Sequence, residues 1–131
     1  MKMLVVEDDF TSRVLLQKLL APYGEVLVAM NGREALEAYD RAEHEGEGYS
    51  LICLDIMMPE LDGQNVLRRI RAAETERGLN PGQGTKVIMT TALEDSRNVM
   101  TAFREQCDAY LVKPIDRRKL VEHLESFGLA A

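Results

Sequence analysis

Residues 51–59 read LICLDIMMP, an apolar run that one carboxylate, Asp55, interrupts. Four apolar residues in succession, Leu51 to Leu54, are typical of a strand that is buried on both faces of a parallel sheet. Desolvating a carboxylate at the end of such a strand is costly unless other groups balance its charge. The stretch therefore predicts a central strand that delivers Asp55 to a charged site.

Short β-rich runs alternate with longer segments of helical period along the rest of the chain. Outward from 51–54, further strands are expected at 4–6, 26–29, 87–90 and 110–112. Helices are expected at about 9–21, from Asn31 through Tyr39, and at about 64–76, 95–106 and 116–127. Continuous apolar strands in this order predict an α/β fold: a five-stranded doubly wound parallel sheet with helices on both faces.

Local signals mark several boundaries between these elements. Asp9 stands where the first helix should begin, and Asn31 with Glu34 three residues later resembles a capping box. The segments EHEGEG at 43–48 and RGLNPGQG at 77–84 are expected to form an acidic turn and a loop.

Composition limits the class of protein. The 131 residues carry a net charge of −6, and 46% of them are hydrophobic and 29% charged, as in an ordinary globular protein. We expect a single domain over 1–131, with a folded core at about 2–127 and no output domain. The acidic balance disfavours direct nucleic-acid binding, and no apolar run approaches the ~20 residues of a membrane span. Cys53 and Cys107 form no Cys-x-x-Cys motif, so we expect reduced, structural thiols in the cytoplasm.

Acids, hydroxyls and one ammonium group follow four of the five expected strands. These residues are Glu7-Asp8-Asp9, Asp55, Thr90-Thr91 and Lys113. Any one of them alone would be an ordinary cap or turn residue. Because ligands of such sheets bind outside the carboxyl ends of the strands, their coincidence at that edge indicates a functional site.

The charges at this edge suggest what the site binds. If Glu7 or Asp8 lies within ~5 Å of Asp55, each carboxylate pair repels by roughly 3 kcal/mol at an effective dielectric near 20. A Mg²⁺ ion, which is usually held by one or two carboxylates, would relieve this repulsion. With Lys113 and a threonine hydroxyl added, the set is suited to a phosphoryl group, which a carboxylate in line could accept.

The sequence resembles a response-regulator receiver domain of two-component signalling, of the single-domain chemotaxis-regulator type. The matching stretches run in family order over nearly the whole chain: MLVVEDDFTSRVLL, AMNGREALE, LICLDIMMPELDG, VIMTTALED and CDAYLVKPID. The ordered set is far more specific than any single stretch. The resemblance implies the strand order 2-1-3-4-5 within a flavodoxin-like fold.

The resemblance also implies a role for each residue of the acidic site. Asp55 would be the residue that is phosphorylated. Glu7 and Asp8 match the acidic pair that holds Mg²⁺ together with Asp55, and Met57 would add its backbone carbonyl as a metal ligand. Alignment on Arg13 favours this acidic pair over Asp8 and Asp9.

Further matches concern the phosphoryl oxygens and the switch. Thr91, rather than Thr90, would bond one phosphoryl oxygen, and Lys113 another. The bond between Lys113 and Pro114 is expected to be cis. Tyr110 matches the aromatic residue that swings inward when the threonine is recruited.

The implied mechanism is a transfer from a phosphohistidine on a histidine kinase or phosphotransfer protein to Asp55. The chain would thus be a signalling protein, not an enzyme with a separate substrate, that catalyses its own phosphorylation and dephosphorylation. Phosphorylation would reshape the surface of the fourth helix, fifth strand and fifth helix and so control an unidentified effector protein. That surface carries Met100 and a basic patch, which is equally consistent with an ordinary solvated face: Arg97, Arg104, Arg117 and Lys119.

The chain departs from many relatives at two positions near the site. Met57 and Leu93 stand two residues after Asp55 and Thr91, where relatives often carry polar groups. Bulky apolar side chains there should shield an acyl phosphate from water, so we predict a long-lived phosphoaspartate. The loop at 77–84 also looks longer than is usual in a receiver.

Two other classes of function compete with this interpretation. An aspartyl-phosphate phosphatase uses similar strand-end groups, but it usually needs a second acid where Met57 stands. A pseudo-receiver that serves only as an interaction module would need no phosphorylation, and the intact site residues speak against it. A nucleotide-binding domain is disfavoured because no glycine-rich phosphate-binding motif follows the first strand.

Overall fold

Five parallel strands form one sheet in the order β2-β1-β3-β4-β5, as the family resemblance implies. The structure is a computed structural model that describes residues 1–58, 61–80, 82–92 and 107–130. The strands are β1 Lys2–Val6, β2 Glu25–Ala29, β3 Leu51–Asp55, β4 Lys86–Thr91 and β5 Ala109–Val112. The helices are α1 Phe10–Leu20, a 3₁₀ turn at Ala21–Tyr23, α2 Gly32–His44, α3 Gly63–Glu76 and α5 Arg117–Ser126. The helix expected at about 95–106 lies outside the described residues.

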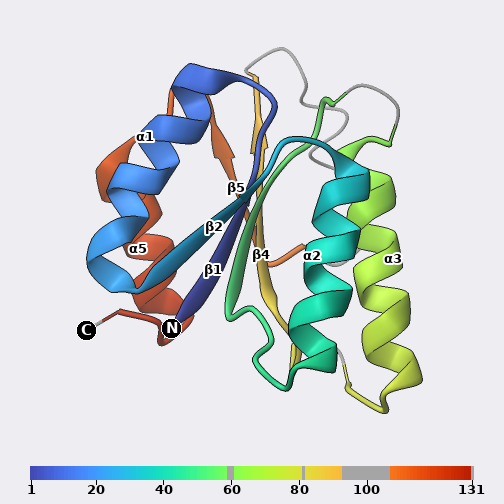
Figure 1. The fold of residues 1–131 in the computed structure, drawn as a ribbon. Helices are drawn as coiled ribbons and strands as arrows, with labels where there is room; N and C mark the ends of the chain where they lie inside the picture. The colour runs from blue at the N-terminus through green and yellow to red at the C-terminus, as the bar shows by residue number, and fades with distance from the viewer. Residues whose placement is uncertain (59–60, 81, 93–106, 131) are drawn as a thin grey trace.

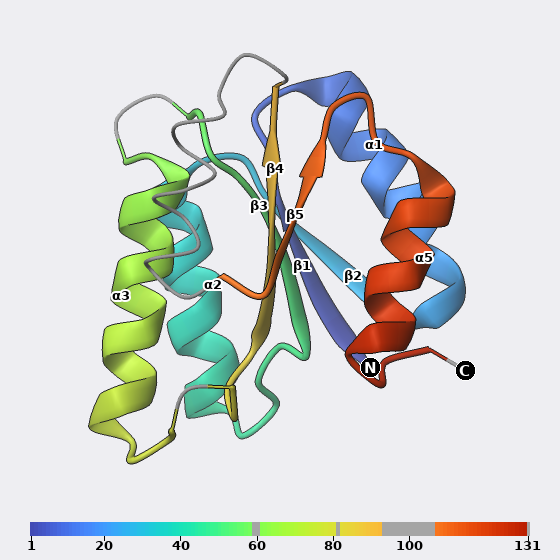
Figure 2. The same ribbon diagram turned by 180° about the vertical axis from the view of Figure 1, so that it is seen from behind.

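Helices cover both faces of the sheet. Helices α1 and α5 lie on one face, and α2 and α3 lie on the other (Figure 1). The reverse view shows the same two layers, with β5 at one edge of the sheet (Figure 2). This arrangement confirms the predicted doubly wound α/β fold.

Alternate residues of each central strand feed two separate apolar clusters. Leu4, Ile52 and Leu54 face the α2 and α3 layer, whereas Met3 and Cys53 face the α1 and α5 layer. Every residue of β3 is buried, which confirms the prediction that Leu51 to Leu54 form a strand covered on both faces, and the strand extends one residue further to Asp55. Burial of each such Leu or Ile side chain stabilises the fold by about 1.5–3 kcal/mol.

The predicted helix starts are confirmed by their caps. The Asp9 carboxylate accepts from the Ser12 N–H at 2.9 Å, and the Asn31 side chain accepts from the Glu34 N–H at 2.9 Å. Glu34 reaches back to the backbone N–H of Met30, one residue before the cap. These contacts satisfy N–H groups that a helix leaves without partners at its first turn.

The end of α2 lies further along the chain than the sequence predicts. An acidic turn is expected at 43–48, but the helix continues through His44 and the turn begins only after it. Gly46, with φ of +78°, ends the helix, and the Glu47 N–H bonds the Ala42 carbonyl. The glycine and not the acidic composition sets the boundary, because few other residues adopt positive φ.

Both cysteines are buried free thiols, and they belong to the clusters on opposite faces of the sheet. Burial raises the pKa of Cys53 to about 12 and that of Cys107 to about 11. Among the helices that the structure describes, none is long and apolar enough to cross a membrane.

Candidate functional site

Three acids from two strands meet at the carboxyl edge of the sheet. Oxygen atoms of Glu7, Asp8 and Asp55, one from each residue, all lie within 4.8 Å of one another. Glu7 and Asp55 are buried, and Asp8 is exposed. The strand register explains the meeting, because β1 and β3 are neighbours that pair Val6 with Leu54, so the next residues of both strands leave the sheet side by side.

Lys113 enters the same pocket from the end of β5. Its Nζ donates to both carboxylate oxygens of Glu7, at 3.1 and 3.0 Å, and lies 3.4 Å from Oδ2 of Asp55. The peptide bond between Lys113 and Pro114 is cis, as the resemblance implies. The resemblance implies that Lys113 contacts a phosphoryl oxygen, which stays a prediction, and in this structure its Nζ lies closer to Glu7 than to Asp55.

The two buried acids of the pocket, Glu7 and Asp55, have pKa values above those of ordinary carboxyl groups. Burial, and then the negative charge of Asp55, raise the pKa of Glu7 to about 7, although Lys113 opposes the shift. Burial also raises the pKa of Asp55, against the attraction of Lys113. Burial would lower the pKa of Lys113, but its hydrogen bond to Glu7 and the charge of Asp55 outweigh this and raise it.

The backbone around Asp55 is held by several close contacts. The Met57 N–H donates to Asp55 Oδ1 at 3.2 Å, and the Ile56 N–H bonds the Thr90 carbonyl at 3.0 Å. Gly63, at the start of α3, packs against this turn so closely that a Cβ there would overlap the carbonyl oxygen of Asp55. Only glycine allows this approach, so α3 fixes the position of the candidate phosphoacceptor.

Thr90 and Thr91 end β4 beside the pocket, and both are buried. The Thr91 hydroxyl donates to the Ala92 carbonyl at 3.1 Å, while the Thr91 carbonyl accepts from the Lys113 N–H at 2.7 Å. Across the described part of the chain, the Thr90 hydroxyl is the one buried side-chain oxygen or nitrogen without a hydrogen-bond partner. The ends of β4 and β5 are therefore tied together through the backbone of Thr91 and Lys113.

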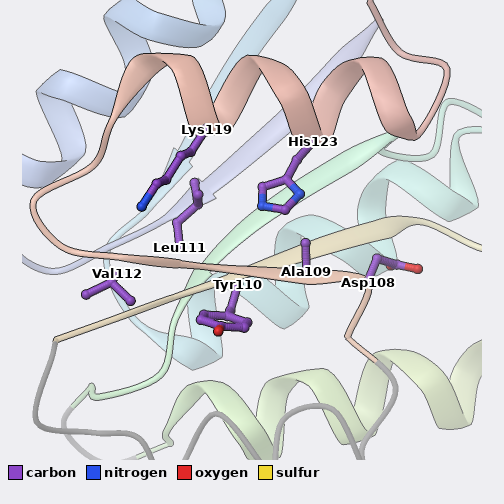
Figure 3. Close-up of a pocket in the computed structure, with 7 residues that line it drawn as sticks. All are labelled: Asp108, Ala109, Tyr110, Leu111, Val112, Lys119 and His123. Carbon is purple, nitrogen blue, oxygen red and sulfur yellow. The ribbon is translucent and has the colours of Figure 1, made fainter.

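Tyr110 lies on edge strand β5, 40% exposed, and lines a groove of about 360 Å³ between β5 and α5. Ala109 and Leu111 point toward α5, whereas Tyr110 and Val112 point away from it (Figure 3). Lys119 and His123 reach toward the strand from α5 (Figure 3). The other residues expected on this surface, Arg97, Met100 and Arg104, lie outside the described residues, as does Leu93.

Two residues support the site although no such role was predicted for them. The Arg13 guanidinium donates to the carbonyl oxygens of Glu7 and Asp8, at 3.2 and 3.4 Å, and so anchors the turn that carries the acidic pair. Gly63 is the second. The position of Arg13, one turn into the first helix after the acidic pair, could have indicated its role. The close packing of Gly63 on the turn that follows Asp55 has no signal in the sequence alone.

Comparisons with known proteins agree on one family. A family model for the response regulator receiver domain matches residues 3–125. The chain is 34% identical over 125 residues to a probable transcriptional regulator of Cyanidium caldarium, covering 95% of this chain and 45% of the relative. It is 33% identical over 128 residues to hybrid signal transduction histidine kinase L of Dictyostelium discoideum, covering 97% of this chain and 7% of that protein. The chain thus spans less than half the length of these two relatives.

A solved structure shares the fold. It is a co-crystal of a histidine phosphotransfer signalling protein with the receiver domain of its downstream response regulator, from Saccharomyces cerevisiae. The TM-score is 0.83 at 24% identity, and the match covers 98% of this chain and 88% of the other.

Proposed function

The chain belongs to the response regulator receiver family, and on that premise we propose that it is a phosphoacceptor switch that receives a phosphoryl group on Asp55 in the presence of Mg²⁺. The observation that carries the proposal is the cluster of Glu7, Asp8 and Asp55 with Lys113 at its edge. Three carboxylates around one ammonium group leave a deficit of positive charge, which suits a site for a cation and a phosphoryl group.

The donor set fits Mg²⁺. The ion prefers oxygen ligands and keeps several waters, and the pocket offers two buried carboxylates and an exposed one. We assign Glu7, Asp8, Asp55 and the backbone carbonyl of Met57 as its ligands. When bound, Mg²⁺ would neutralise charge that develops on the phosphoryl oxygens.

In the transfer, a carboxylate oxygen of Asp55 attacks phosphorus in line with the leaving imidazole nitrogen. The P–N bond of the phosphohistidine breaks as the new O–P bond forms, and the electron pair stays on the imidazole. Lys113 and the Thr91 hydroxyl then each bond a phosphoryl oxygen. Lys113, which contacts Glu7 in this structure, would then move its Nζ toward the phosphoryl group.

The proposed donor is a histidine kinase or a histidine phosphotransfer protein. The names of two similar proteins support this choice, since one is a hybrid histidine kinase and another was crystallised with a phosphotransfer protein. Exposed apolar side chains follow β1, β2 and β3 at the edge of the sheet that carries the site. They are Phe10, Met30 and Met57, which are 69%, 50% and 56% exposed. These apolar groups suit a protein donor that presents its histidine to Asp55.

The proposed output is a change of surface around Tyr110. Recruitment of Thr91 to the phosphoryl group would let Tyr110 leave its exposed position, which alters the surface around β5. A downstream protein that distinguishes the two surfaces would then read the phosphorylated state.

Intact mass measurement tests the proposal directly. The protein is incubated with a small phosphodonor such as acetyl phosphate and with Mg²⁺, and the expected product carries one added phosphoryl group. Asp55→Asn protein, and wild-type protein with a chelator, should gain none. Absence of uptake from small donors and from candidate kinases alike would favour a pseudo-receiver that acts only through protein contacts.

A further inference from the structure

The described methionines differ sharply in exposure. Met3 and Met89 are fully buried and Met58 is nearly so, whereas Met57 is 56% exposed and Met30 50%. Only an accessible thioether sulfur reacts readily with a dissolved oxidant. Met57, which is more exposed than Met30, can therefore react with a dissolved oxidant, whereas its neighbour Met58 is protected by burial.

Met57 is also held at the candidate phosphoacceptor. Its backbone N–H donates to Oδ1 of Asp55 at 3.2 Å, so the residue cannot move away without breaking that bond. Met30 is similarly exposed but follows β2, the strand at the far edge of the sheet from β5 and two positions from β3. Oxidation of Met57 would thus change the surroundings of Asp55, and oxidation of Met30 would leave them unchanged.

We propose that Met57 is an oxidation site through which a peroxide shortens the lifetime of the phosphorylated state. The sulfur attacks one oxygen of hydrogen peroxide, the O–O bond breaks, and an S–O bond forms. The second peroxide oxygen takes up the proton of the transferred oxygen and leaves as water. The sulfur is oxidised by two electrons and the peroxide is reduced by two, and the product is methionine sulfoxide.

The sulfoxide reverses the character of the side chain beside Asp55. An apolar thioether keeps water from the acyl phosphate, whereas a sulfoxide oxygen is a strong hydrogen-bond acceptor that holds water near it. One added hydrogen bond to the attacking water predicts hydrolysis about fivefold faster. The inference rests on the proposed function, because it concerns the lifetime of phosphoaspartate at position 55.

The experiment uses the whole chain, treated with hydrogen peroxide or left untreated. Peptide mass mapping follows oxygen uptake at each of the seven methionines. Both samples are then phosphorylated with acetyl phosphate and Mg²⁺, the donor is removed, and loss of the phosphoryl group is timed. Met57→Leu keeps an apolar side chain of similar volume without sulfur, and Met30→Leu is the matched control.

The expected result is oxidation of Met57 well before Met58, with a phosphoryl half-life about fivefold shorter in treated wild-type and Met30→Leu proteins. Treated and untreated Met57→Leu should have equal half-lives. The proposal is overturned if Met58 oxidises as fast as Met57, if oxidised Met57 leaves the half-life unchanged, or if Met57→Leu responds to peroxide as wild type does. Failure of the untreated wild type to take up phosphoryl would instead overturn the proposed function.

Discussion

Arg71 joins three elements at the end of the sheet opposite the acidic pocket, and its replacement by Met should be severely destabilising. Its Nη1 donates to Glu74 at 2.7 Å and to the Thr85 carbonyl at 2.8 Å, and its Nη2 donates to Asp108 at 2.8 Å. The Arg71 side chain is only 15% exposed, and those of Glu74 and Asp108 are 7% and 18% exposed. The guanidinium thus links α3 to the segments that begin β4 and β5.

The expected cost follows from what Arg71→Met would leave behind. Glu74 and Asp108 would keep their bonds from the Thr85 and Val87 N–H groups, but both would lose their ion pair with the Arg71 guanidinium. Removing one partner of a buried ion pair costs about 3–5 kcal/mol. Because these carboxylates retain backbone donors and some access to water, we expect about 3 kcal/mol, a large share of a typical domain's stability.

Urea denaturation followed by far-UV circular dichroism would measure this cost, since the chain has no tryptophan. Arg118→Met is the matched control, because Arg118 pairs with Glu122 at 3.4 Å on the surface, with side chains 88% and 62% exposed. Such pairs contribute about 0.5 kcal/mol or less. Equal effects of the two substitutions would refute the assignment of Arg71 as a structural link.

A double-mutant cycle isolates the contact between Arg71 and Asp108. Asp108→Asn removes the charge but keeps an oxygen for the Val87 N–H, so that backbone bond should survive. A coupling free energy of about 1.5–3 kcal/mol is expected for a charged hydrogen bond at this burial. Additive effects would show that the two side chains stabilise the fold independently.

Three further predictions concern the acidic pocket. Met57→Asn should shorten the phosphoryl half-life about fivefold, and an unchanged half-life would contradict the shielding role of Met57. Without Mg²⁺, the folded protein keeps a proton on Glu7 up to a pKa of about 7, whereas the unfolded chain releases it near 4.5. The free energy of unfolding should therefore fall as pH rises from 4.5 to 7. Urea titrations at several pH values should show a smaller fall for Glu7→Gln than for wild type, and an equal fall in the two proteins would disprove this. Gly63→Ala should cost about 1–3 kcal/mol and impair phosphoryl uptake, because its Cβ overlaps the Asp55 carbonyl; wild-type stability and uptake would argue against that close contact.

The sequence predicts the fold well because the relevant signals are local. Leu51 to Leu54 form a continuous apolar run, and such a run is stable only when both faces are covered. Asp9 and Asn31 mark helix starts because a short polar side chain bonds the N–H three residues later. The strand order came from the family resemblance, and the meeting of Glu7, Asp8 and Asp55 follows because parallel strands deliver their carboxyl ends to one edge of the sheet.

The contacts that the sequence could not predict join residues without a common local pattern. Arg71 and Asp108 are 37 residues apart, and nothing in either neighbourhood distinguishes them from solvated surface charges. The choice of Glu7 over Asp55 as the main partner of Lys113 depends on differences of a few tenths of an ångström. Such differences arise from packing of the whole sheet edge, which no spacing rule encodes.

In the pocket without ligands, buried carboxylates repel one another, and this unfavourable electrostatic energy suits a protein that switches between two states. Glu7 and Asp55 are buried with raised pKa values, and one ammonium group is shared between them. A pocket already neutralised by fixed cations would gain little from a metal ion or a phosphoryl group. Here the proposed metal ion and phosphoryl group would both relieve the repulsion among carboxylates that the fold holds together through β1, β3 and β5. The proposed ligands can therefore shift the equilibrium of the protein, since a ligand shifts states only by its difference in affinity for them.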